Sequence, residues 1–210
     1  MLTNVVFVPL KFIKWIITIA FEMMTFRLTG LQVFSRFMYF PGVGWNTIRW
    51  RLQNLQWYNR IDNTVVLGAL PFRSQAEELV NKENVRAVIS FNEDFELQWF
   101  TPSSKEWQKL GVDHYHFRVI DRVTPSLDVI DEALEVINRH RQRKESVYVH
   151  CKSGKGRSVT VVGCYMMKLK EYKWEPQRVI EEMKRKRPQI HPNKSHRNTL
   201  NLFYSKEPKP

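Results

Sequence analysis

The chain has 210 residues, 43% of them hydrophobic, which is enough for one packed domain of about 150 residues plus an appendage. Lysine and arginine number 33 against 21 acidic residues, a formal net charge of +12. We therefore expect an anionic partner: a nucleic acid, an acidic membrane surface or a phosphorylated substrate. Only two cysteines occur, Cys151 and Cys164, which excludes a disulfide scaffold and favours a reducing compartment.

Residues 1–61 differ in composition from the rest of the chain. They carry one acidic residue, Glu22, against seven basic residues, and they are rich in Phe, Ile, Trp and Met. The longest uncharged apolar run, Trp15–Phe21, is far shorter than the roughly 20 residues that span a bilayer. Lys11 and Lys14 interrupt the apolar stretch, which disfavours a secretory signal peptide. The composition is typical of a mitochondrial presequence, and it also fits an interfacial helix on an anionic membrane or an extra helix packed on the domain.

The proline and glycines of Tyr39–Trp45 indicate a break between two parts of the chain. We expect residues 1–56 to form an N-terminal amphipathic helical extension with a targeting or membrane-associating role. Residues 57–205 are expected to form a globular domain.

After Trp57, strand-like and helix-like patterns alternate along the chain. In chain order, the predicted elements are a strand at Thr64–Leu70, a helix at Ser74–Glu83, a strand at Val85–Phe91, a helix at Ser104–Gly111, a strand at Val112–Val119, a helix at Leu127–Lys144, a strand at Ser146–His150, a buried helix from near Arg157, a helix at Glu175–Arg187 and a last helix near Asn193–Tyr204. Ser74, Ser103 and Ser126 are the expected N-caps of three of these helices. Such alternation implies an α/β domain with a mostly parallel central sheet flanked by helices.

The segment VHCKSGKGRS, Val149–Ser158, places Cys151 among three basic side chains and two glycines, between a predicted strand and a predicted helix. A chain that curls from Cys151 to Arg157 points successive backbone N–H groups at one spot, and the following helix points its positive end there. Gly154 and Gly156 permit the dihedral angles that such a curl needs. The sequence therefore predicts an anion cradle, in which Arg157 adds a planar, two-pronged hydrogen bond to phosphate oxygens.

The same electrostatic field acts on the thiol. Near bases and a helix N-terminus the pKa of a cysteine falls from about 8.5 to roughly 3.5–7.5, so we expect Cys151 to be a thiolate nucleophile beneath a bound phosphate. The predicted product is a phosphocysteine intermediate, which water then hydrolyses. His150 is expected to orient the loop, and Ser158 is expected to hydrogen-bond the sulfur and ease its departure.

The leaving-group alkoxide needs a proton, so an acid must reach the cradle. Asp121 lies 30 residues upstream of Cys151, at the end of a predicted strand, and is our candidate general acid in the first step and base in the second. A simple turn or cap aspartate before Thr124 and Pro125 is the alternative interpretation. Asp113 is disfavoured because it begins its strand.

Other chemistries fit the loop less well. A zinc site lacks a second cysteine at ligand spacing, and the G-x-x-x-x-G-K-[ST] pattern of a nucleotide-binding loop is absent. A structural role for Cys151 and a nucleic-acid partner for the positive charge remain alternatives. No metal or other cofactor is expected, because the cradle already supplies positive charge. Cys164 lies in a long apolar run and is expected to be a buried core residue.

The segment HCKSGKGRS resembles the H-C-x5-R-[ST] signature of the cysteine-dependent protein-tyrosine and dual-specificity phosphatases, and Asp121 matches the acid spacing of that family. The resemblance implies a dual-specificity phosphatase fold, with Cys151, Arg157 and Asp121 as catalytic residues. It implies that the remaining loop residues bind phosphate: Lys152, Ser153, Gly154, Lys155, Gly156 and Ser158.

Over about Trp57–Leu200, the chain is more closely similar to the mitochondrial dual-specificity phosphatases that convert phosphatidylglycerophosphate to phosphatidylglycerol for cardiolipin synthesis. The similar segments are WYNRIDNTVVLGALPFRS, NVRAVISFNEDFE, SKEW and SVYVHCKSGKGRS. In that family an acidic loop supports the active site, and the corresponding residues here are Asn92, Glu93, Asp94, Phe95 and Glu96. The family usually has Glu-Glu-Tyr-Glu, so Asp94 and Phe95 depart from its pattern and the tyrosine hydroxyl is lost. A plain polar turn is the alternative interpretation of this segment.

Lys152 and Lys155 occupy the positions of two loop lysines that bind additional phosphates in the inositide 3-phosphatase tumour suppressor. They favour a substrate with more than one negative charge, a requirement that phosphatidylglycerophosphate and the phosphoinositides both meet. The resemblance therefore implies a lipid phosphatase that acts on an anionic phospholipid at a membrane surface, on the matrix side of the mitochondrial inner membrane. We expect a monomer with no nucleic-acid partner. The alternatives are a phosphoinositide phosphatase, a dual-specificity phosphoprotein phosphatase and a non-catalytic phosphate-binding module.

Overall fold

A computed structural model describes residues 13–14, 16–18, 20 and 30–206 of the chain. The chain divides into two compact units, Met1–Phe40 and Pro41–Pro210. Helix α2 (Gly30–Phe37) belongs to the first unit, and helix α3 (Tyr39–Leu52) begins there and continues into the second. Within the described residues, no helix combines the length and the apolar character needed to cross a bilayer. The apolar run Trp15–Phe21 includes residues outside the described set.

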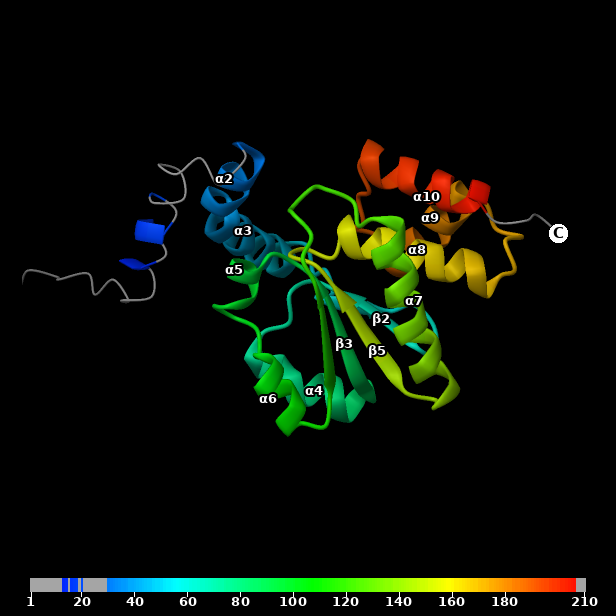
Figure 1. The fold of residues 1–210 in the computed structure, drawn as a ribbon. Helices are drawn as coiled ribbons and strands as arrows, with labels where there is room; N and C mark the ends of the chain where they lie inside the picture. The colour runs from blue at the N-terminus through cyan, green and yellow to red at the C-terminus, as the bar shows by residue number, and fades with distance from the viewer. Residues whose placement is uncertain (1–12, 15, 19, 21–29, 207–210) are drawn as a thin grey trace, which may run out of the picture. The chain divides into compact units, whose positions relative to one another are not determined.

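The second unit is built on one five-stranded sheet (Figure 1). Its strands, in spatial order, are β1 (Tyr58–Arg60), β2 (Val65–Gly68), β5 (Ser146–His150), β3 (Val85–Phe91) and β4 (Asp113–Phe117). Only β1 is antiparallel to its neighbour, so the prediction of a mostly parallel sheet is confirmed. Strand β1 was not predicted, because its three residues are too few to show a strand pattern.

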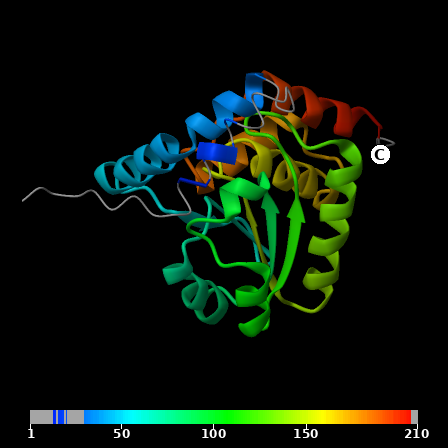
Figure 2. The ribbon, with the colours of Figure 1, turned by 60° about the vertical axis from the view of Figure 1, so that its left-hand side comes forward.

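Helices cover both faces of this sheet. They are η1 (Arg73–Gln75), α4 (Ala76–Lys82), α5 (Asp94–Leu97), α6 (Ser104–Lys109), α7 (Leu127–Gln142), α8 (Arg157–Leu169), α9 (Pro176–Lys186) and α10 (Lys194–Lys206). Along β5, Val147 and Val149 face a core shared with α7 to α10, whereas Tyr148 faces a smaller core shared with α4 and α6. Because successive side chains of a strand point to opposite faces, a fully apolar strand must be covered on both sides. Figure 2 shows α7 and α4 on opposite sides of the strands.

Two of the three predicted helix caps are confirmed. The Ser103 hydroxyl accepts from the backbone N–H of Glu106, whose carboxylate accepts from the backbone N–H of Ser103, as a capping box requires. The Ser126 hydroxyl accepts from the backbone N–H of Val129 at the start of α7. The prediction for Ser74 is wrong, because this residue lies inside the 3-10 turn η1 rather than before a helix.

The boundary between the two compact units, from Phe40 to Pro41, lies inside the predicted break at Tyr39–Trp45, but the helix is not interrupted there. Helix α3 runs through this segment, and the irregular residue is Met38, which is a turn between α2 and α3. Pro41 lies in the first turn of α3, where backbone N–H groups have no partner inside the helix, so its missing N–H costs no hydrogen bond. The proposed functional division at residue 56 stays a prediction.

Candidate active site

The loop Cys151–Gly156 lies at the carboxyl end of the sheet, between β5 and α8. Gly154 has a φ of +63°, and a Cβ there would overlap the backbone carbonyl of Gly68 at the end of β2. Only glycine combines this left-handed conformation with so close an approach of two backbones. The end of β2 therefore fixes the curl of the loop from outside.

Arg187, at the end of α9, holds the same loop from the other side. Its guanidinium donates to the backbone carbonyls of Gly154 at 3.1 Å and Ser153 at 3.4 Å, and also to Gln56 and Asn59. Arg187 is fully buried. Since it binds the carbonyl oxygens of the loop from outside, it favours a conformation in which the backbone N–H groups face the enclosed side.

The thiol of Cys151 lies at the base of the loop, with 2% of its surface exposed. Burial alone raises the pKa of this thiol, but the guanidinium of Arg157, the Ser158 hydroxyl and the backbone N–H groups of Ser153 and Ser158 lower it further than burial raises it. The net pKa is below the ordinary value. The expected hydrogen bond from Ser158 Oγ to the sulfur is present at 3.3 Å. Cys164 contrasts with it: this thiol is buried in the core as predicted, and burial raises its pKa.

Arg157 is clamped by a buried carboxylate from the acidic segment after β3. Its Nη1 lies 2.8 Å from Glu96 Oε2 and its Nη2 lies 3.0 Å from Glu96 Oε1, a two-pronged ion pair in which both side chains are almost fully buried. Nη1 also donates to the backbone carbonyl of Val119 at 2.7 Å. The guanidinium plane is therefore fixed before any ligand arrives.

Asp121 reaches the loop, as the sequence predicts, although it does not end a strand. Strand β4 ends at Phe117, and Asp121 follows in a turn. One carboxylate oxygen pairs with Arg157 Nη2 at 3.1 Å and the other accepts from Lys152 Nζ. Burial raises the pKa of Asp121, but Arg157 and Lys152 outweigh burial and hold it below its ordinary value. Asp121 thus offsets, with its own negative charge, part of the positive charge of Arg157 and Lys152.

The remaining residues of the acidic segment have different surroundings. Glu93 precedes the short helix α5, and its backbone N–H donates to Glu96 Oε2. Asp94 points elsewhere, pairing with Arg118 at 2.9 Å on the exposed surface. Phe95 is buried. Of the three acidic residues assigned by resemblance, the structure brings Glu96 to the loop and leaves Asp94 outside it.

His150 forms the inner end of a chain of polar side chains. Its Nε2 lies 2.6 Å from Ser90 Oγ, which lies 2.8 Å from His114 Nε2, and His114 Nδ1 lies 2.9 Å from Ser104 Oγ. Burial lowers the pKa of His150 to about 3 and that of His114 to about 4, so both rings are neutral at pH 7. The chain ties His150, the last residue of β5 and the neighbour of Cys151, to β3, β4 and α6.

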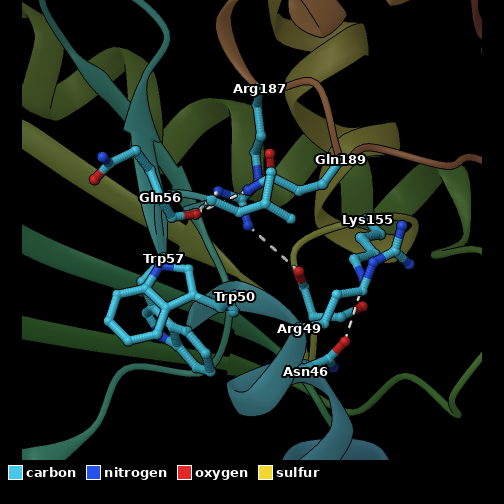
Figure 3. Close-up of a pocket in the computed structure, with 11 residues that line it drawn as sticks. Asn46, Arg49, Trp50, Gln56, Trp57, Lys155, Arg187 and Gln189 are labelled. Atoms are coloured by element: carbon cyan, nitrogen blue, oxygen red, sulfur yellow. Dashed lines mark hydrogen bonds between the residues drawn. The ribbon is translucent and has the colours of Figure 1, made fainter. Parts of the chain in front are cut away.

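The two loop lysines point in different directions. Lys152 turns to Asp121, whereas Lys155 Nζ donates to Asn46 Oδ1 of α3 at 3.1 Å. A Cβ on Gly42, also in α3, would lie 3.6 Å from Lys152 Nζ. The part of α3 in the second unit therefore runs beside the loop. Figure 3 shows Asn46 and Lys155 with their hydrogen bond.

Four further residues that shape this site, Arg187, Asn46, Ser90 and His114, have no signature in the sequence. Arg187 stands in a basic run at the end of a helix, Asn46 lies in a segment assigned to an N-terminal extension, and Ser90 and His114 lie inside strands. None of them has a local pattern that separates it from an ordinary surface or strand residue. Within the described residues, no group of three or more His, Cys, Asp or Glu side chains is arranged to hold a metal ion.

The lowered pKa of Cys151 has a direct chemical consequence. We expect iodoacetamide to alkylate this thiol with a pH midpoint below about 8.5, the ordinary cysteine value, because the thiolate is the reactive form. Mass spectrometry of the labelled peptide as a function of pH measures the midpoint, and Cys164 serves as the internal control that stays unlabelled. A midpoint at or above the ordinary value would contradict the electrostatic account of the loop.

The ion pair between Glu96 and Arg157 predicts a large effect on stability. Glu96→Gln keeps the shape of the side chain but leaves the buried guanidinium with less compensating charge, so the free energy of unfolding should fall by about 3 kcal/mol. Asp94→Asn is the matched control on the same helix, and its exposed pair with Arg118 predicts a change below about 1 kcal/mol. Denaturant unfolding compares the two variants, and equal losses would show that Glu96 has no special role.

Comparisons with known proteins agree with this geometry. The family model of the dual specificity phosphatase catalytic domain matches residues 71–206. The chain is 34% identical over 174 residues to the human protein named phosphatidylglycerophosphatase and protein-tyrosine phosphatase 1, covering 81% of this chain and 86% of that protein. It is 33% identical over 149 residues to the phosphatidylglycerophosphate phosphatase PTPMT1 of Arabidopsis thaliana, covering 70% of this chain and 43% of that protein.

Among solved structures, the crystal structure of PTPMT1 in complex with PI(5)P matches with a TM-score of 0.68 and 35% identity, covering 72% of this chain and 96% of that one. The sheet, the loop between β5 and α8 and these similarities lead to one conclusion. The chain belongs to the dual specificity phosphatase family of cysteine-dependent phosphatases.

Proposed function

We propose that this phosphatase hydrolyses the terminal phosphomonoester of phosphatidylglycerophosphate to give phosphatidylglycerol, a step in cardiolipin synthesis. The observation that carries this proposal is the similarity, over most of both chains, to a human protein whose name includes that activity. Two Arabidopsis thaliana relatives named phosphatidylglycerophosphate phosphatases support it. The charge of the site agrees, since Lys152, Lys155 and Arg157 surround a loop that already favours anions.

The proposed chemistry has two steps. The Cys151 thiolate attacks phosphorus, the bond from phosphorus to the glycerol oxygen breaks, and Asp121 gives a proton to the leaving alkoxide. Water then attacks the phosphocysteine, Asp121 takes a proton from that water, and the sulfur leaves as a thiolate that Ser158 stabilises by its hydrogen bond. Arg157, Lys152 and the backbone N–H groups from Ser153 to Gly156 stabilise the phosphoryl oxygens throughout.

Asp121 needs to become protonated before it can act as an acid. Its carboxylate pairs with Arg157 and Lys152, and these two cations hold its pKa below the ordinary value. A phosphate dianion in the loop would replace Asp121 as the partner of Arg157 and put a like charge beside its carboxylate. A neighbouring negative charge raises the pKa of a carboxyl group, so substrate binding would itself favour the protonated form.

A second candidate function is hydrolysis of a phosphoinositide. The specific observation in its favour is the complex of PTPMT1, a protein 35% identical in the matched region, with PI(5)P. A phosphoprotein substrate is a third candidate, because the name of the human relative also includes protein-tyrosine phosphatase activity.

We further propose that the enzyme works at a membrane surface. Three large apolar side chains of α3, Trp45, Ile48 and Leu52, are 64%, 52% and 80% exposed, and their spacing places them on one side of the helix. Arg49 and Arg51 accompany them and suit anionic lipid. The acid-poor residues 1–56 support a mitochondrial location, on the matrix side of the inner membrane. In this proposal the enzyme acts as a monomer and binds no nucleic acid.

A substrate panel tests the assignment. The purified protein should show a higher kcat/KM for phosphatidylglycerophosphate than for phosphoinositides or a phosphotyrosine peptide, each measured by phosphate release. Cys151→Ser is the control, since it should bind substrate without turnover. A clear preference for the peptide would overturn the lipid assignment, and turnover by Cys151→Ser would overturn the mechanism.

The loss of rate that follows from removing the general acid should depend on how well the leaving group departs without a proton. We expect Asp121→Asn to lower kcat for an alkyl phosphate by about 100-fold, because an alkoxide leaves poorly without a proton, and to change kcat for an activated aryl phosphate far less. Steady-state kinetics with both substrates measure the difference. Equal slowing would remove Asp121 from the acid role.

The targeting role of the N-terminal segment has its own test. A fluorescent reporter fused to residues 1–61 should accumulate in mitochondria, because the segment is basic and almost free of acids. The same fusion with its seven basic residues changed to glutamine is the control and should remain in the cytosol. Cytosolic fluorescence of the native fusion would contradict the proposed location.

A further inference from the structure

A small pocket of about 30 Å³, open to solvent on one side, adjoins the phosphate-binding loop on the side of α3. Its lining comes from α3, from the start of the domain, from the loop itself and from the end of α9: Asn46, Arg49, Trp50, Leu55, Gln56, Trp57, Ala69, Ser153, Lys155, Arg187 and Gln189. All of these residues belong to the second unit. Figure 3 shows the cationic side chains of Arg49, Lys155 and Arg187 around this pocket.

In the described part of the chain, the three cations of this pocket have no carboxylate as a direct partner. Among the described residues, no carboxylate lies within ion-pair distance of Arg49, Lys155 or Arg187; their hydrogen-bond partners are neutral oxygens. Arg187 is 1% exposed and Lys155 is half-buried. Buried like charges without a counter-ion are unfavourable, so the arrangement is suited to receiving an anion.

The electrostatics of the individual groups agree with this view. Burial, together with Arg49 and Arg187, lowers the pKa of Lys155, and burial lowers the pKa of Arg187 to about 10. A bound anion would reverse these shifts. The indole Nε1 of Trp50, a residue that also lines the pocket, is buried and has no hydrogen-bond partner within the described part of the chain. A donor of this kind would be satisfied by an acceptor in the pocket.

The pocket lies next to the loop that would bind the terminal phosphate of the substrate. Ser153 and Lys155 belong both to the loop that would bind the phosphomonoester and to the pocket lining, so the two sites share a wall. In phosphatidylglycerophosphate, a short glycerol separates the terminal phosphate from a second phosphate, which is a singly charged diester. We propose that this pocket is a second anion subsite, which holds the phosphodiester of the headgroup while the loop holds the terminal phosphate. This inference rests on the function proposed above.

The proposed subsite would explain why α3 lies beside the phosphate-binding loop. This helix contributes Asn46, which fixes Lys155 Nζ at 3.1 Å, and Arg49, whose charge lies at the exposed side of the pocket. A substrate with one phosphate would fill the loop and leave the pocket unused. The preference for a headgroup with two phosphates over one with a single phosphate would then depend on Arg49 and Lys155, which lie away from the reacting phosphorus.

The test uses the full-length protein and three substrates. Glycerophosphoglycerophosphate carries both phosphates without acyl chains, glycerol 3-phosphate carries one, and phosphatidylglycerophosphate in vesicles presents both at a membrane. Arg49→Gln should lower the ratio of kcat/KM for glycerophosphoglycerophosphate to that for glycerol 3-phosphate by about tenfold, because a charge-assisted hydrogen bond to the diester is lost. Arg51→Gln is the matched control, since it removes the same charge from the same helix outside the pocket, and it should leave the ratio unchanged.

Binding without turnover gives a second measurement. On the Cys151→Ser background, Arg49→Gln should weaken the binding of glycerophosphoglycerophosphate about tenfold and leave the binding of inorganic phosphate unchanged. An unchanged ratio and unchanged binding would overturn the subsite. An effect of Arg49→Gln that occurs only with vesicles would also overturn it, because the anion would then be the phosphate of a neighbouring lipid. If the wild type instead prefers a phosphopeptide in the substrate panel, the proposed function fails, which is a separate result.

Discussion

The structure of this site depends on the buried ion pair between Glu96 and Arg157. A guanidinium so close to a thiol lowers the pKa of that thiol, but only if its own position is fixed and its burial is compensated. Glu96 supplies both conditions from a short helix that follows the central strand β3. The acidic segment assigned by resemblance therefore has a physical explanation, which is the support of Arg157 rather than direct contact with a ligand.

The carboxylate of Asp121 offsets part of the positive charge of this loop. Asp121 pairs with Arg157 and Lys152, so a phosphate that binds these cations would compete with Asp121 for them. This competition links binding to protonation in the mechanism that we propose. The alternative reading of Asp121 as a simple turn residue does not account for its two contacts with the loop.

Helix α3 both contacts the phosphate-binding loop and carries the exposed apolar side chains on which the proposed membrane contact rests. The part of it that belongs to the second unit places a glycine near Lys152 and an asparagine against Lys155, and it leaves Trp45, Ile48 and Leu52 exposed. A single helix would thus meet the membrane with one side and the headgroup with another. The proline and glycines in this segment predicted the boundary between the two units but not the helix that runs through it, because local composition cannot show that a proline will fall in the first turn of a helix.

The sequence alone determined the parallel α/β fold and the loop Cys151–Gly156, because both have local signatures: apolar strands of fixed length, serine caps with their acidic partners, and glycines beside a cysteine. It also indicated Asp121, through its place after a predicted strand, and Glu96, through resemblance rather than through pattern. Tertiary structure alone decided that Glu96 rather than Asp94 clamps Arg157, and that Arg187 and Asn46 shape the loop. These contacts join residues up to 109 positions apart, and no periodicity or spacing encodes them. They arise because parallel strands bring loops distant in the chain to one edge of the sheet.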